Sequence, residues 1–341
     1  MQDIADELGL SRNTVSKALN NAPGLADATR ERIIQKAREM GYKHFVLAQA
    51  LMTPDQEGAL PISGRKYSGE IALLSSRFLG GSHFASLTID AFHSQIDRLG
   101  FTLGMHRVRP AHIESLLLPT TFKRERVAAI ICFEMFDRAY DEMLCDLGLP
   151  ILFVDGPAPV DGRQLPADQL CMENIMGISR LVKDVVAAGR TRIGFIGNYR
   201  HCRSFYERYA ALRLALDLEG LPLEDKFVIP HNGLQMIGTC FEERGELPDL
   251  FVCANDFVAT KALLALRGLG FDVPRDVWLS GFDDSPESRT CIPPLTTVHI
   301  HTHIIAHTAV RLLLSRMDEP SLEYRQVHTE TELLYRASTP L

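Results

Sequence analysis

Short apolar segments alternate with longer amphipathic ones over most of the chain, from residue 69 to near the C-terminus. The apolar segments are EIALLSS, FTLGMHRV, VAAIICF, PILFVDG, RIGFIGN, LFVCAND and VWLSGFDD. Runs of this length are typical of buried strands, and the segments between them repeat their apolar residues as helices do. This alternation predicts parallel sheets with helices on both faces. Because about 270 residues exceed one ordinary domain, we expect two doubly wound lobes.

Composition and charge narrow the class of protein. The chain has 46% hydrophobic and 23% charged residues, no apolar run of 18 residues and no N-terminal segment typical of a signal peptide. We therefore expect a cytoplasmic protein with no membrane partner. Its seven cysteines occur singly, without a C-x-x-C pair, which predicts free thiols. Residues 1–51 hold seven Lys or Arg against six Asp or Glu, whereas the rest holds 29 against 37, so nucleic-acid contacts are expected only at the N-terminus.

The first 45 residues predict three short helices. Gly9 interrupts the first helical pattern where a turn would need a positive φ, and Ser11 can cap a second helix through the amide of Asn13 or Thr14. The exposed side of that second helix carries hydrogen-bond donors on Arg12, Asn13, Ser16 and Lys17. ADATRERIIQKAREMGY predicts the third helix. A helix-turn-helix fits this order, and an ordinary surface helical hairpin is the alternative.

The stretch DIADELGLSRNTVSKALNNAPGLADATRERIIQKAREMGY resembles the DNA-binding head of the LacI/GalR (lactose-repressor) family of bacterial transcriptional regulators. The resemblance implies base contacts in the major groove of double-stranded operator DNA from Arg12, Asn13 and Lys17. It implies DNA backbone contacts from Ser11, Thr14, Ser16 and Asn20. A dimeric repressor is expected, since two-fold protein symmetry is normally matched by a pseudo-palindromic site.

After the head, the family continues into a hinge helix that places a leucine in the minor groove. Leu51 falls in register here, although His44 and Phe45 replace the usual Pro-Asn pair and Gln49 replaces an arginine. An inserted leucine would kink the duplex. The alternative is that this apolar segment is a linker packed on the body.

The body is similar to the effector-binding core of the same family, which is shaped like a periplasmic sugar-binding protein. The similarity is carried by CANDFVATKALLALRGLGFDVPRDVWLSGFDD, AGRTRIGFIG, PPLTTV and ERYAALRLAL. It implies that Arg208 and Asp256 hold effector hydroxyls from one lobe and Asp155 from the other. A guanidinium and carboxylates can each make paired, charge-assisted hydrogen bonds to neighbouring hydroxyls. Two alternatives stay open: Asp256 caps the helix starting at Phe257, or Arg208 is a surface charge.

Departures from the family pattern affect the expected ligand. SHFA replaces the usual N-P-F-F, which leaves Phe84 to contact a sugar face, and Ile300 stands where a glutamine is common. We expect a sugar or sugar derivative as effector, with a nucleoside or another corepressor as the alternative.

Other functions are disfavoured by the motifs. The chain has no G-x-S-x-G, P-loop, H-E-x-x-H or dinucleotide-binding turn, so neither an enzyme nor a bound cofactor is expected. A metal-responsive regulator remains an alternative because HIHTHIIAH supplies His299, His301, His303 and His307. A transport protein is disfavoured by the head. The expected organisation is a head (1–45), a hinge helix and linker (46–68) and a core (69–341), whose lobes comprise 69–167 with 299–328 and 168–298 with 329–341.

Overall fold

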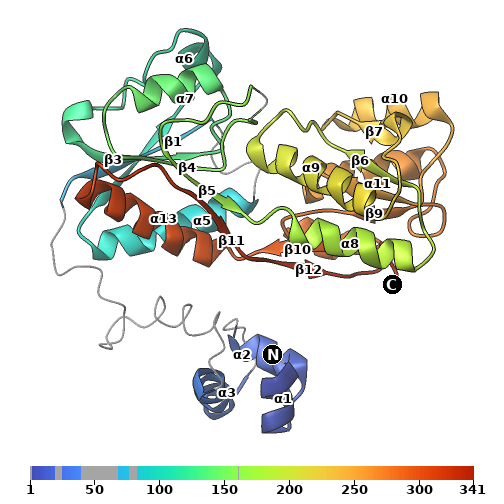
Figure 1. Cartoon of the computed structure of the whole chain (residues 1–341). Coiled ribbons are helices and arrows are strands. Elements are labelled where there is room, and N and C mark those ends of the chain that lie inside the picture. The colour runs from blue at the N-terminus through green and yellow to red at the C-terminus, as the bar shows by residue number, and fades with distance from the viewer. Residues whose placement is uncertain (1, 20–24, 40–67, 77–82, 160) are drawn as a thin grey trace. The chain divides into compact units, whose positions relative to one another are not determined.

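The structure is a computed structural model, and it describes residues 2–19, 25–39, 68–76, 83–159 and 161–341. The chain divides into two compact units, Met1–Lys66 and Tyr67–Leu341 (Figure 1). The predicted hinge helix and linker, including Leu51, lie almost entirely outside the described residues.

The N-terminal unit contains the three predicted helices, α1 (Gln2–Leu8), α2 (Arg12–Leu19) and α3 (Asp27–Glu39). Gly9 adopts a φ of +64° between α1 and α2, which is the left-handed conformation that the sequence predicts there. The helices pack around the buried side chains of Ile4, Ala5, Val15, Ala18 and Ile33. An ion pair of 2.8 Å between Lys36 Nζ and Glu7 Oε2 also joins α3 to α1.

The first lobe of the larger unit contains an all-parallel sheet in the order β11-β5-β4-β3-β1-β2. Its strands are β1 (Glu70–Ser75), β2 (Thr102–Arg107), β3 (Val127–Phe133), β4 (Ile151–Val154), β5 (Asp168–Met172) and β11 (Gln326–Thr329). Helices α5 (His83–Arg98) and α13 (Thr302–Asp318) lie together on one face, whereas α6 (Pro110–Glu114) and α7 (Arg138–Cys145) lie on the other (Figure 1). Apolar side chains of β1, β3 and β4 form a core with α7.

The second lobe is built around a four-stranded parallel sheet in the order β7-β6-β8-β9. The strands are β6 (Ile193–Ile196), β7 (Val228–Ile229), β8 (Leu250–Cys253) and β9 (Trp278–Ser280). Its helices are α8 (Met176–Ala187), α9 (Arg203–Leu218), α10 (Leu234–Arg244), α11 (Asp256–Gly268) and α12 (Pro286–Thr290). Parallel sheets covered by helices confirm the predicted architecture of two doubly wound lobes.

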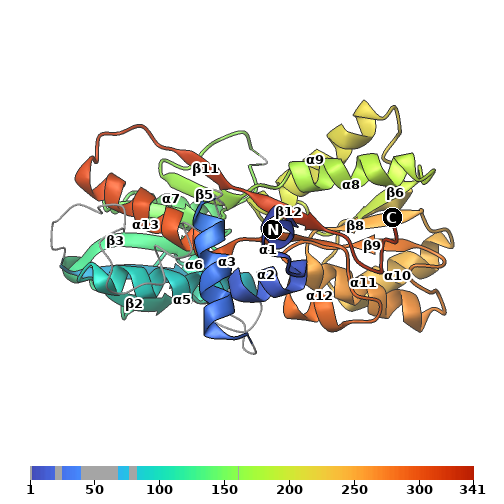
Figure 2. The ribbon, with the colours of Figure 1, turned by 90° about the horizontal axis from the view of Figure 1, so that it is seen from below.

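Within the described residues, the larger unit crosses between its lobes three times. The first crossing follows β5, because β5 pairs with β4 and β11 in the first sheet, so it comes a few residues after the expected boundary at 168. The second crossing follows β10 (Thr297–Ile300), and the third lies between β11 and β12 (Thr331–Leu334). Strands β10 and β12 pair antiparallel. Figure 2 shows β11 continuing into β12 as the chain passes from one lobe to the other.

The carboxylate of Asp168 connects neighbouring elements at one edge of the first sheet. Its buried carboxylate accepts hydrogen bonds from Arg316 Nε and Nη2, both at 3.0 Å, and from Arg325 Nη2 at 2.9 Å. Although burial opposes ionisation, these donors hold the pKa of Asp168 below its usual value. The start of β5 is thereby joined to α13 and to the residue preceding β11.

All seven cysteines lie within the described residues and are free thiols, as the sequence predicts. None of the helices in the described part of the chain combines the length and apolarity that crossing a membrane would require.

Candidate functional site

The exposed side of α2 carries three of the side chains predicted to contact DNA bases. Ser11 Oγ accepts a hydrogen bond of 3.1 Å from the amide of Thr14, so it caps α2 as predicted. Arg12 and Asn13 are exposed in the first turn, and Lys17 is exposed one turn later. Two further predicted DNA contacts, the Ser16 side chain and Asn20, lie outside the described residues.

A cavity of about 510 Å³ lies in the larger unit. Its lining comes from loops that follow the strands of both sheets and from the starts of the next helices, as expected for open α/β sheets. The first lobe contributes Ser76, Phe84, Ile113, Glu134, Met135, Phe136, Asp137, Asp155 and Met172. The second contributes His201, Cys202, Ser204, Phe205, Arg208, Asn232, Gly233, Asn255, Phe257, Val258, Lys261 and Asp283.

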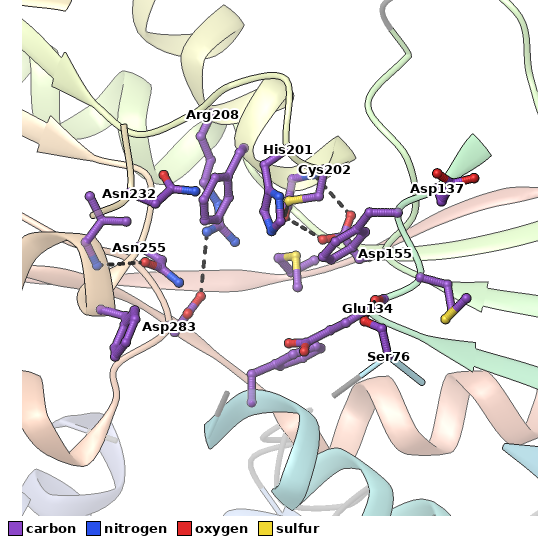
Figure 3. Close-up of a pocket in the computed structure, with 18 of the residues that line it drawn as sticks. Ser76, Glu134, Asp137, Asp155, His201, Cys202, Arg208, Asn232, Asn255 and Asp283 are labelled. Atoms are coloured by element: carbon purple, nitrogen blue, oxygen red, sulfur yellow. Dashed lines mark hydrogen bonds and ion pairs between the residues drawn. The ribbon is translucent and has the colours of Figure 1, made fainter. Parts of the chain in front are cut away.

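Asp155 lies on the first-lobe side of the cavity, directly after β4, as predicted (Figure 3). Its Oδ2 accepts a hydrogen bond of 2.6 Å from Ser204 Oγ, and its Oδ1 accepts one of 3.1 Å from the Ser204 amide. Since Ser204 belongs to α9 of the second lobe, Asp155 already connects the two lobes.

Arg208 lies on the opposite side of the cavity and faces Asp283 (Figure 3). Its side chain is 2% exposed, so the alternative of a surface charge is wrong. Nε donates to Asn174 Oδ1 at 2.9 Å, Nη1 donates to Ala254 O at 2.6 Å, and the guanidinium stacks 3.5 Å from the Phe282 ring centroid. These contacts fix the direction in which the guanidinium points.

Asp283 follows β9 and was not singled out by the sequence analysis. Its Oδ1 lies 3.6 Å from Arg208 Nη1. Burial raises the pKa of Asp283 to about 7, although the Arg208 guanidinium opposes this shift.

Three acidic residues that line the cavity have positive backbone φ angles. These angles are 52° at Glu134 after β3, 58° at Asp155 after β4 and 108° at Asp283 after β9. Non-glycine residues rarely adopt such angles, and those that do cluster at functional sites because the surrounding structure must compensate for the strain. The loops at the strand ends thus hold these carboxyl groups in place.

Asp256 does not line the cavity, so the structure contradicts its expected position beside the effector. Its Oδ1 accepts a hydrogen bond of 2.6 Å from Thr297 Oγ1, and its Oδ2 accepts one of 2.7 Å from the Ser285 amide. A Cβ atom at Gly281 would lie only 2.1 Å from Asp256 Oδ1, which shows how tightly this carboxylate is enclosed. The helix cap is Asn255 instead, whose side chain accepts from the Val258 amide and also lines the cavity.

The cavity lining contains more phenylalanine side chains than the sequence predicts. Phe84 lines the cavity as predicted, and Phe136, Phe205 and Phe257 join it. Ile300 is buried in β10 and is not part of the lining, so the substitution at this position does not make the cavity more apolar.

The four histidines of HIHTHIIAH do not form a convergent group of metal ligands within the described residues. His299 Nδ1 is 2.9 Å from Asp284 Oδ2, whereas His307 Nδ1 is 3.3 Å from Gln95 Oε1 on α5. The rings of His299 and His307 are thus directed at different partners, so the geometry of the described residues gives the metal-responsive alternative no support. In the described part of the chain, Cys171, Glu207 and His328 are the group whose ligand atoms lie close enough to share an ion.

Comparisons with known proteins agree with these features. Residues 1–44 match the family model described as bacterial regulatory proteins, lacI family, and residues 182–339 match the periplasmic binding protein-like domain. The HTH-type transcriptional regulator GalR of Lacticaseibacillus casei is 28% identical over 353 residues, which cover 99% of this chain and 98% of that relative. The lacI family model thus matches the N-terminal head, and the likeness to GalR extends over nearly the whole chain.

Solved structures show the same fold as this chain. The transcriptional regulator CelR–cellobiose complex has a TM-score of 0.67 at 22% identity and covers 98% of both chains. The lac repressor dimer bound to operator and the anti-inducer ONPF has a TM-score of 0.62 at 22% identity, covering 99% of this chain and 98% of that one. At these identities the solved structures show a shared fold.

Several residues that line the cavity were not predicted from the sequence. They are Ser76, Glu134, Asp137, His201, Asn232, Asn255, Lys261 and Asp283. A signal for some of them was present, because Asn255 and Asp283 follow predicted strands, where ligands of α/β sheets bind.

Proposed function

We propose that this protein is a LacI-family regulator that represses transcription as a homodimer. It would bind a pseudo-palindromic operator with one α2 helix in the major groove of each half-site. Arg12, Asn13 and Lys17 would contact bases, while Ser11, Thr14, Ser16 and Asn20 would contact the DNA backbone. Leu51 would enter the minor groove. The exposed donors of a capped α2 support this assignment. Since an operator lies on the bacterial chromosome, the proposed location is the cytoplasm.

We further propose that a small polar effector, a sugar or sugar derivative, controls operator binding from the cavity of the core. The observation that carries this proposal is that charged side chains reach the cavity from both lobes, with Asp155 on one side and Arg208 with Asp283 on the other. An effector can shift an equilibrium only through different affinities for two lobe arrangements, so it has to contact both lobes. Charged groups can pair with sugar hydroxyls, while phenylalanines such as Phe84 can cover the apolar face of a sugar ring.

A thermal-shift screen of sugars, sugar phosphates and nucleosides tests the effector class. A ligand that binds only the folded protein raises its melting temperature. We expect a neutral or phosphorylated sugar to raise the melting temperature of the core and to change operator affinity at matching concentrations. A response to nucleosides alone would contradict the proposed class of effector.

Replacing Arg12 with alanine should relax sequence preference at one base position in each half-site. The expected loss is about 1–3 kcal/mol of operator-binding free energy per lost bidentate contact. Sites selected from random DNA with wild-type and Arg12→Ala protein would measure this. Arg32→Ala, which removes an exposed arginine on α3, is the matched control and should leave the preferred sequence unchanged. Equal weakening of Arg12→Ala on all DNA sequences would identify a phosphate contact instead.

A further inference from the structure

Three potential metal ligands meet where α9 of the second lobe contacts the first sheet. Cys171 on β5 and His328 on β11 are directly paired across the two strands, so their side chains share a face of the sheet. Glu207 reaches them from α9. The Sγ, Nε2 or Nδ1, and carboxylate oxygen atoms of these residues all lie within 4.8 Å of one another.

The separation between His328 and Glu207 fits two ligands of one ion as well as a long ion pair. His328 Nε2 lies 3.4 Å from Glu207 Oε2, whereas charge-assisted hydrogen bonds are usually about 2.7–2.9 Å long. Nitrogen and oxygen ligands lie about 2.0–2.1 Å from a tetrahedral zinc ion, which separates two such ligands by about 3.3–3.4 Å. A small displacement of the Cys171 thiol would complete this arrangement.

Surrounding side chains orient the Glu207 carboxylate. Asn174 Nδ2 donates to Glu207 Oε2 at 2.7 Å and to Met172 O at 2.9 Å, while Asn174 Oδ1 accepts from Arg208 Nε. Hydrogen bonds of this kind fix the direction of metal ligands in known sites. They also place the cluster one residue away from Arg208 of the effector cavity.

The local charges allow a divalent cation. Arg203 Nη1 lies 3.5 Å from Glu207 Oε1, and the Cys171 thiol donates a hydrogen bond of 3.7 Å to Asp155 Oδ1, so binding of the ion would release the thiol proton. The two charges of the cation would then be balanced by the Cys171 thiolate and the Glu207 carboxylate. Arg203 is 8% exposed, and its Nε has no hydrogen-bond partner among the described residues, so a donor remains for an oxygen ligand that completes the coordination.

We propose that Cys171, Glu207 and His328 bind a divalent cation that accepts mixed sulfur, nitrogen and oxygen ligands, with zinc as the expected ion. Thiolate and imidazole favour zinc over magnesium or calcium, which prefer oxygen ligands. Because two ligands belong to the first lobe and one to the second, the ion would stabilise the lobe arrangement in which they converge. Its effect on operator binding rests on the proposed function, whereas binding of the ion does not.

Cobalt(II) titration of the full-length protein, purified without a histidine tag and treated with a chelator, tests the site. We expect one equivalent of cobalt to produce the visible bands of tetrahedral cobalt and a near-ultraviolet thiolate-to-cobalt band. Zinc chloride should displace both. Cys171→Ser and His328→Gln should lose the thiolate band, whereas Cys145→Ser and His301→Gln, which alter a cysteine and a histidine elsewhere, should retain it.

Folding of each variant is checked by circular dichroism and thermal melting. If Cys171→Ser does not fold, Glu207→Gln replaces it and should weaken cobalt binding at least tenfold. The proposal is overturned if wild type shows no thiolate-to-cobalt band. It is also overturned if the band persists in both Cys171→Ser and His328→Gln, or if only His301→Gln removes it.

Discussion

Replacing Arg208 with alanine is expected to abolish the response to effector while operator binding without effector persists. Arg208 is buried at the cavity, where it contacts Asn174, Ala254 and Asp283, and no other arginine lines the cavity within the described residues. The head is a separate compact unit, so its DNA contacts should survive the change. Operator titrations with and without the ligand found by thermal shift would measure both quantities.

Two further variants separate a lost effector contact from a damaged fold. Arg208→Lys keeps the positive charge but lacks the planar pair of donors, so it should retain the fold and still respond poorly. Arg213→Ala removes an exposed arginine from the same helix and should respond like wild type. If Arg208→Ala responds at wild-type effector concentrations, the cavity assignment is wrong.

Replacing Asp168 with alanine should lower the free energy of unfolding of the core by about 3–5 kcal/mol. The change would leave the buried Arg316 guanidinium without its carboxylate partner, and breaking one side of a buried ion pair usually costs this much. Urea denaturation followed by circular dichroism would measure the loss. Glu246→Ala breaks the exposed pairs with Arg192 and Lys226 and should change stability little.

Acid titration provides an independent check on Asp168. Its pKa is lower in the folded protein than in the unfolded chain, so its contribution is present above the usual aspartate pKa and is lost as pH falls through the folded value. Wild-type stability should therefore decline below about pH 4, and the decline should be shallower in Asp168→Ala. Parallel declines in both proteins would show that Asp168 is not the titrating group.

The strands that could be predicted are those whose apolar runs are buried by local packing. Strands β1, β3, β6 and β8 follow this pattern, and their helices follow from periodicity. Strand β5, with the sequence DQLCM, was missed because its first residue is a buried aspartate. Only Arg316 and Arg325, about 150 residues later in the chain, make that burial possible. The error in the lobe boundary has the same origin.

The cavity residues that could be predicted are those whose position a family motif defines. Asp155 and Arg208 were located by resemblance and line the cavity. Asn255 and Asp256 are adjacent at the start of α11, where successive side chains point in different directions. The close approach of Gly281 and the hydrogen bond from Thr297 decide which of the two faces the cavity, and neither follows from local sequence.

Synthesis of this chain from its N-terminus has a consequence for how the protein folds. The head emerges first and can pack its three helices early, whereas neither lobe can be completed before the C-terminal segment has been synthesised. Helix α13 and strand β11 complete the first lobe, and Ser338 and Thr339 donate to Leu279 O in the second. A stop codon shortly before residue 302 would therefore leave both lobes unfinished, and the nascent protein would present a finished DNA-binding head on an incomplete core.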